Sequence, residues 1–117
     1  GHLALPNVDA SGAPASLSHE VVTNILRRQL NFDGLIFTDD LDMKALPQND
    51  AREIAVRALQ AGNDQLLFCH DIGKAFVARD AITKAIENRV LDVTQIEASL
   101  ARIHRTKKRF DLTNVAV

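Results

Sequence analysis

The architecture of this chain is clearest in residues 32–43, which read Phe-Asp-Gly-Leu-Ile-Phe-Thr-Asp-Asp-Leu-Asp-Met. A short β-prone run from Leu35 to Thr38 follows the turn-forming pair Asp33-Gly34 and leads directly into acidic residues. In parallel α/β proteins the carboxyl ends of the strands face the crevice where ligands bind. The acids at this strand end are therefore the first candidates for chemistry.

Apolar strands and amphipathic helices alternate on both sides of this stretch. The sequence predicts the tail of one strand at 2–5 and further strands at 35–38 and 65–69. Helices are expected over about 19–30, 50–61, 74–88 and 94–109. Their predicted caps are Ser18, Asp50, Asp71 and Thr94, and Gly62 is a stop signal. Single helices between buried strands indicate the α/β class with a parallel sheet, and residues 111–117 are expected to form a loose tail.

The composition sets limits on partners. Of the 117 residues 46% are apolar and the net charge is -1, so we expect neither a nucleic acid nor a membrane as a partner. No apolar run approaches the about 20 residues of a membrane span. The single cysteine, Cys69, excludes an internal disulfide and is expected to be buried in its strand.

Four stretches of the chain, taken in order, resemble glycoside hydrolase family 3, above all its bacterial β-N-acetylglucosaminidases. They are Leu3-Ala4-Leu5-Pro6, Pro14-Ala15-Ser16-Leu17-Ser18, the run from Leu26 to Met43, and the run from Ala58 to Asp64. The resemblance covers residues 1 to about 110. It implies a (β/α)8 TIM barrel, of which residues 1–117 would be the end of strand six and βα units seven and eight.

The resemblance also implies retaining hydrolysis of terminal β-linked N-acetylglucosamine in peptidoglycan or chitin fragments, with no cofactor and no metal. Asp39 matches the family's nucleophile. The residues agree, because a retaining glycosidase requires an ionised carboxylate that is rigidly aimed at the anomeric carbon. The family's general acid/base lies upstream, and nothing in these residues matches that segment. We therefore expect the isolated chain to be inactive.

The two acids after Asp39 carry other expectations. Neighbouring strand residues point to opposite sides, so Asp40 is expected to fix the loop through backbone amides rather than to share the pocket. Asp42 departs from the small polar residue common at this place in the family and is expected to be solvated.

Three further residues are candidates for substrate binding. His2 matches a histidine that the family often carries at the end of strand six, with a satisfied structural histidine or a cloning remnant as the alternatives. Met43 is a candidate for lining the sugar site, and plain packing fits it equally well. His70 closes the last predicted strand and so faces the catalytic end.

Two other functions stay open at this point. Asp39, Asp40 and Asp42 are hard oxygen ligands, which would suit a receiver-like or phosphatase-like magnesium domain. The basic run from Arg102 to Arg109 would suit a non-catalytic interaction module, although positive charge at a helix end also has the simpler role of complementing the helix dipole.

Assembly and location are expectations of the same kind. A three-strand segment would leave sheet edges unpaired, so we expect it to contact the rest of the parent barrel or another copy, through residues 3–5 or 66–69. We expect a cytoplasmic location, and a periplasmic or secreted parent stays open because the sequence starts inside a predicted strand.

Overall fold

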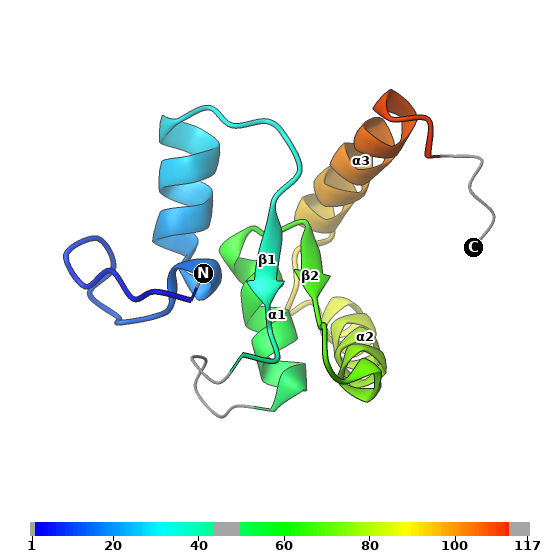
Figure 1. Ribbon diagram of the computed structural model, residues 1–117, viewed down its shortest axis with the longest axis horizontal. Coiled ribbons are helices and arrows are strands. Elements are labelled where there is room, and N and C mark those ends of the chain that lie inside the picture. The colour runs from blue at the N-terminus through cyan, green and yellow to red at the C-terminus, as the bar shows by residue number, and fades with distance from the viewer. Residues whose placement is uncertain (1, 44–49, 113–117) are drawn as a thin grey trace.

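A computed structural model describes residues 2–43 and 50–112 of the chain. The elements in order are η1 (Ala15–Leu17), η2 (Glu20–Gln29), β1 (Phe37–Asp40), α1 (Ala51–Ala61), β2 (Gln65–Leu67), α2 (Ile72–Glu87) and α3 (Val93–Arg109). The two strands lie side by side in the middle of the molecule, with α1 behind them, η2 on one side, and α2 and α3 on the other (Figure 1). Within the described residues no helix is both long and apolar enough to cross a membrane.

The strands confirm the predicted class and correct the predicted number. β1 and β2 pair in parallel with α1 between them in the chain, as expected for a βα unit. Residues 2–5 do not add a third strand to this sheet. Among the described residues Ala4 forms only an isolated antiparallel bridge with Pro14, because the chain turns back after Leu5, whose carbonyl accepts the amides of Val8 and Asp9.

The β1–β2 ladder contains an irregularity. Phe37 lies opposite Gln65 and Asp40 lies opposite Leu67, with a register shift between the two pairs. β1 therefore advances three residues while β2 advances two, which is the pattern of a β-bulge with its extra residue in β1.

The helix caps were largely predictable. Asp50 accepts from the Arg52 amide at the start of α1, and Gly62 ends that helix with a φ of 112°. Asp71 caps α2 by accepting from the Gly73 amide. The prediction of Thr94 as the cap of the last helix is wrong. Asp92 takes that role, and its carboxylate accepts from the amide of Thr94 itself at 2.9 Å.

The core lies between the sheet and the helices. The buried side of α1 carries Ile54, Ala55, Ala58, Leu59 and Ala61, at the spacing of one helix face. Ala85 and Leu91 extend this core toward α2 and α3. Helical spacing of Val22, Ile25, Leu26 and Leu30 predicts one buried stripe on the helix expected over 19–30, but Leu30 is 68% exposed. η2 is a π-helix in which the Leu30 amide bonds the Ile25 carbonyl, and this wider turn carries Leu30 off the stripe.

Candidate active site

Asp39 lies near the carboxyl end of β1, as predicted. Along this strand Thr38 and Asp40 are buried, whereas Phe37 and Asp39 are exposed. α1 lies behind one face of the two strands and leaves the other face open (Figure 1), and the alternating burial assigns Thr38 and Asp40 to the covered face. Asp39 is thus an accessible carboxylate held on a strand rather than on a flexible loop.

The surroundings of Asp39 favour its charged form. The Asp40 amide donates to Asp39 Oδ1 at 2.9 Å. This hydrogen bond is the main reason that the pKa of Asp39 lies below its ordinary value. The carboxylate is therefore ionised at neutral pH, which is the state that a nucleophile requires.

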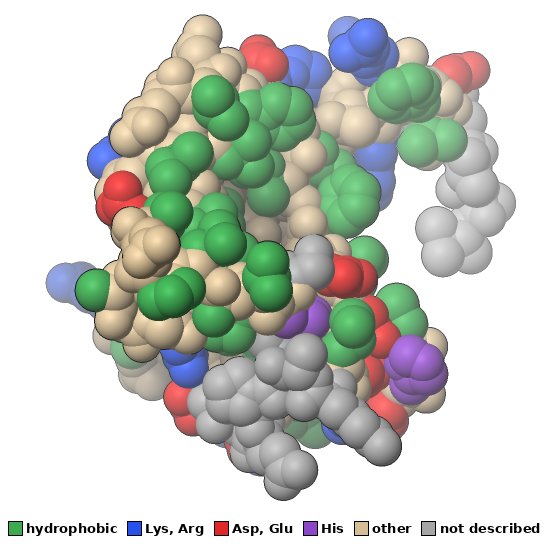
Figure 2. All heavy atoms as spheres, turned by 60° about the vertical axis from the view of Figure 1, so that its left-hand side comes forward, with side chains coloured by type: hydrophobic (Ala, Val, Ile, Leu, Met, Phe, Trp, Pro, Cys, Tyr) green, Lys and Arg blue, Asp and Glu red, His purple; other side chains and the backbone are tan. Residues whose placement is uncertain are grey.

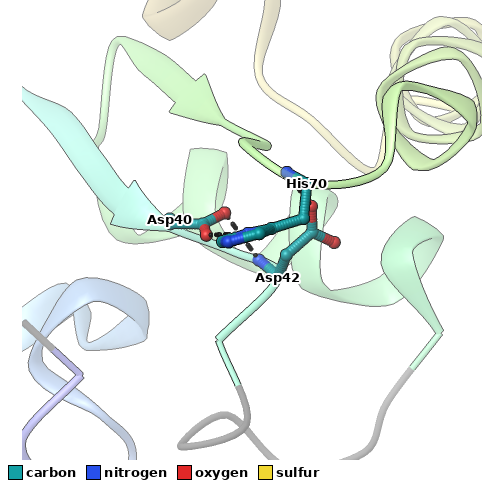
Figure 3. Close-up of side chains that lie close together, drawn as sticks. All are labelled: Asp40, Asp42 and His70. Atoms are coloured by element: carbon teal, nitrogen blue, oxygen red, sulfur yellow. Dashed lines mark hydrogen bonds and ion pairs between the residues drawn. The ribbon is translucent and has the colours of Figure 1, made fainter.

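Asp40 lies on the other side of the strand and contacts the segment that follows β2. Its Oδ1 accepts from the amides of Asp42 and Cys69, both at 3.0 Å. Its Oδ2 lies 2.8 Å from Nδ1 of His70 (Figure 3). The amide bonds, first that of Asp42, hold the pKa of Asp40 below its ordinary value. The expectation that Asp40 fixes the loop through backbone amides is confirmed.

Asp42 corrects a prediction, because its side chain is only 3% exposed. Its Oδ2 accepts from the amides of His70 and Asp71, both at 3.1 Å. Lys74 Nζ lies 2.8 Å from its Oδ1. Together these partners, led by Lys74, lower the pKa of Asp42 to about 2. Asp42 is therefore a buried anchor between the end of β1 and the start of α2, and not a solvated acid.

His2 is buried and uses both ring nitrogens. Nε2 lies 2.7 Å from the Asp40 carbonyl, and Nδ1 lies 2.6 Å from Ser16 Oγ. Because a carbonyl can only accept, Nε2 carries the proton and Nδ1 accepts from the serine hydroxyl. This is the arrangement of a structural histidine whose hydrogen bonds are satisfied, one of the alternatives to substrate binding that the sequence left open for His2.

His70 and Met43 lie at the same end of the strands. The His70 imidazole is 78% exposed although Nδ1 is paired with Asp40. Met43 is 43% exposed and its amide bonds the Asp40 carbonyl at 3.3 Å. Cys69, expected in a buried strand, is exposed because β2 ends two residues earlier, at Leu67.

The geometry disfavours the magnesium reading. Within the described part of the chain Asp40, Asp42 and His70 form a group with ligand atoms within 4.8 Å of one another, and Asp39 is not in it. The predicted set of three carboxylates therefore does not converge. The Lys74 ammonium already supplies positive charge to Asp42.

The basic run on α3 is also partly used inside the molecule. Arg102 Nη1 bonds Asp64 Oδ1 at 2.7 Å, and Arg105 Nη2 bonds the Asp33 carbonyl at 2.6 Å. These contacts tie α3 to the amino-terminal ends of the strands. They give two of the positive charges a structural role.

Sequence reasoning missed several contributors to this site. Lys74 and Ser16 had no assigned role, and Thr38 was read only as the end of a strand. Lys74 follows His70 by four residues at the start of a helix, which was a usable signal. Ser16 carried none, because its contact with His2 spans 14 residues of chain.

Comparison with known proteins gives one consistent result. The family described as "Glycosyl hydrolase family 3 N terminal domain" matches residues 1–106. A β-hexosaminidase of Idiomarina loihiensis is 36% identical over 115 residues, which cover 92% of this chain and 34% of that protein. A β-hexosaminidase of Bordetella parapertussis is 37% identical over 110 residues, covering 93% of this chain and 28% of the relative.

A solved structure agrees with these relatives. The glycoside hydrolase family 3 β-N-acetylglucosaminidase of Paenibacillus sp. str. FPU-7 superposes with a TM-score of 0.89 at 33% identity, over 96% of this chain and 22% of that one. The chain spans about a third of the length of the curated relatives it matches.

Proposed function

Because this chain belongs to glycosyl hydrolase family 3, we propose that it is part of a retaining β-N-acetylglucosaminidase and carries the nucleophile, Asp39. The substrate would be terminal β-linked N-acetylglucosamine in peptidoglycan or chitin fragments. The observation that carries the proposal is an ionised, accessible carboxylate at the carboxyl end of β1, fixed by the amide of Asp40.

The architecture supports this reading. β1 with α1 and β2 with α2 would be two consecutive βα units of a (β/α)8 barrel, with residues 1–117 as part of its catalytic domain. In such a barrel the active site is built at the carboxyl ends of the strands. Asp39, His70 and Met43 all lie at that end of the sheet, and Asp39 is on the uncovered face that would form the barrel interior.

The proposed reaction has two steps. The Asp39 carboxylate attacks the anomeric carbon, the glycosidic C–O bond breaks, and its electron pair stays on the departing oxygen, which takes a proton from a general acid. Water then attacks the same carbon, gives a proton to the conjugate base, and releases Asp39 as the free carboxylate. The acid/base group would come from outside these residues, and His70 and Met43 would contact the sugar.

The test is the variant Asp39→Ala in the full-length protein, assayed with an aryl N-acetyl-β-glucosaminide. We expect kcat to fall by orders of magnitude at an unchanged melting temperature, because Asp39 is exposed and its loss leaves the packing intact. The control is Asp33→Ala, whose side chain is 93% exposed and lies before β1.

A second measurement makes the assignment specific. Sodium azide should restore turnover of the alanine variant and produce the α-glycosyl azide, since a small anion can enter from the side that Asp39 left. Near-normal activity of Asp39→Ala without azide would contradict the nucleophile assignment.

A further inference from the structure

The register shift in β1 lies between Phe37 and Asp40 and so includes Asp39. Between the pairs Phe37–Gln65 and Asp40–Leu67 the first strand contains one residue more than the second. Bulges are rare in parallel pairs, and where they occur they interrupt the ladder and redirect a side chain. The direction of the Asp39 carboxylate therefore depends on whatever holds this bulge in place.

Two side chains of β1 take part in the ladder at this point. The Leu67 amide donates to Thr38 Oγ1 at 3.1 Å, and the Cys69 amide donates to Asp40 Oδ1 at 3.0 Å. Thr38 and Asp40 are 2% and 8% exposed, so the acceptor side chains of these two part-buried bonds are shielded from solvent. Main-chain pairing resumes with the bond from the Leu41 amide to the Leu67 carbonyl at 2.8 Å.

Asp40 connects this arrangement to Asp39. Its amide donates to Asp39 Oδ1 at 2.9 Å, and its carbonyl accepts from His2 Nε2 at 2.7 Å. His70 engages its second carboxylate oxygen. Both ends of the Asp40 residue are thus fixed, and the amide that points at Asp39 has little freedom to turn.

We propose that Thr38 and Asp40 are positioning residues. Their side-chain oxygens accept from the amides of Leu67 in β2 and of Cys69 just after it, and so aim the Asp39 carboxylate at the anomeric carbon. The inference rests on the proposed function and assigns a part to each residue of Thr38-Asp39-Asp40. The middle residue reacts. Its two neighbours, on the opposite face of the strand, fix the orientation of its carboxylate.

The first test replaces Thr38 in the full-length protein. Thr38→Val keeps the shape but removes the acceptor for the Leu67 amide, and we expect kcat to fall at least about tenfold with KM changed less than about threefold. The acid limb of the kcat/KM profile should move to higher pH as the Asp40 amide loosens from Asp39. Thr38→Ser keeps the oxygen and should restore kcat to within about threefold.

A matched control is Thr83→Val, because the Thr83 hydroxyl is exposed and bonds the Arg79 carbonyl within α2. Its kinetics should not change. A Thr38→Val enzyme with normal kcat, or a Thr38→Ser enzyme as impaired as the valine variant, would overturn the proposal.

Asp40 provides an independent pair of variants, which decides the matter if Thr38→Val does not fold. Asp40→Asn keeps an acceptor for the Cys69 and Asp42 amides and should retain most of kcat, whereas Asp40→Leu should lose it. Equal kcat in the two would contradict the positioning role.

Asp39→Ala is measured alongside these variants. Full activity there refutes the proposed function, while its loss with an unaffected Thr38→Val refutes only the positioning.

Discussion

Arg102 Nη1 lies 2.7 Å from Asp64 Oδ1, although 38 residues separate them in the chain. The Asp64 side chain is fully buried and also accepts from Arg27, from Ser99 and from the Ile36 amide. One carboxylate thereby joins η2, the start of β1 and α3 at the end of the sheet opposite Asp39. A buried charge with this many partners is costly to disturb, because each partner loses its bond together with it.

We therefore predict that Asp64→Asn lowers the free energy of unfolding by about 3–5 kcal/mol. The amide leaves two guanidinium groups without their counter-charge and supplies only one acceptor oxygen. Chemical denaturation of the variant and of the unmodified protein measures the difference.

The matched control is Asp80→Asn, which removes an acid whose pair with Arg79 is exposed, with side chains 67% and 64% accessible. Its effect should stay within about 0.5 kcal/mol. Equal losses in the two variants would mean that Asp64 is not the stabilising hub that its contacts indicate.

Local signals predicted much of this fold. Asp50 with Gly62 and Asp71 with its following helix are short-range patterns, and the structure has them where the sequence placed them. The alternation of Asp39 and Asp40 between the two faces of a strand follows from the strand period alone. The open and covered faces of the site were therefore predictable.

The predictions that the structure corrects concern contacts between residues distant in the sequence. Asp42 is buried because the amides of His70 and Asp71, nearly thirty residues further on, point at it. The register shift beside Asp39 likewise depends on β2, and no pattern in residues 35–40 encodes it. Residues 44–49, which follow Met43, lie outside the described part of the chain.

The pair of Asp42 and Lys74 makes stability depend on pH. The pKa of Asp42 is about 2 in the folded chain, below the value of about 3.9 for an unfolded aspartate. A depressed folded pKa stabilises the fold above about pH 4, and this contribution is lost as the pH falls toward 2. Lys74→Met should raise that pKa toward the unfolded value, so that the variant is less stable above pH 4 and loses less of its stability on acidification.

Denaturation midpoints measured from pH 7 to pH 2 test this prediction. The difference between Lys74→Met and the unmodified protein should be largest above pH 4 and should shrink toward pH 2, where Asp42 becomes protonated. Lys84→Met, an exposed lysine of the same helix, should run parallel to the unmodified protein. A Lys74→Met difference that stays constant over the whole range would rule out the ion pair as its cause.

The isolated 117-residue chain should not hydrolyse an aryl N-acetyl-β-glucosaminide above the buffer rate. Retaining hydrolysis needs a proton donor beside the nucleophile, and the family's acid/base segment has no match here. A continuous assay of released phenol against an Asp39→Ala sample of equal purity measures the residual rate. Robust Asp39-dependent turnover would point to His70, which is exposed, rather than to the buried Asp42.

The same isolated chain should self-associate. The sheet face that α1 leaves open carries Phe37 at 58% exposure and Leu67 at 38%. Hydrophobic side chains also gather over the η2 side of the molecule (Figure 2), and a groove of about 340 Å³ lies along β2, α2 and α3. Burial of apolar surface contributes about 25 cal/mol per Å², so covering several hundred Å² would add several kcal/mol to a marginal free energy of folding.

Sedimentation velocity over a range of concentrations tests this expectation. We expect a dimer or larger species, with the contact on the β2 side, since residues 3–5 are engaged in a turn and a bridge with Pro14. Leu67→Glu should shift the chain toward monomer by placing a charge on the open sheet face. Leu112→Glu, at a residue 49% exposed beyond the end of α3, should leave association unchanged. A stable monomer with a sharp two-state melt would show that the chain tolerates its uncovered face, and would count against the view that this face is built to be covered.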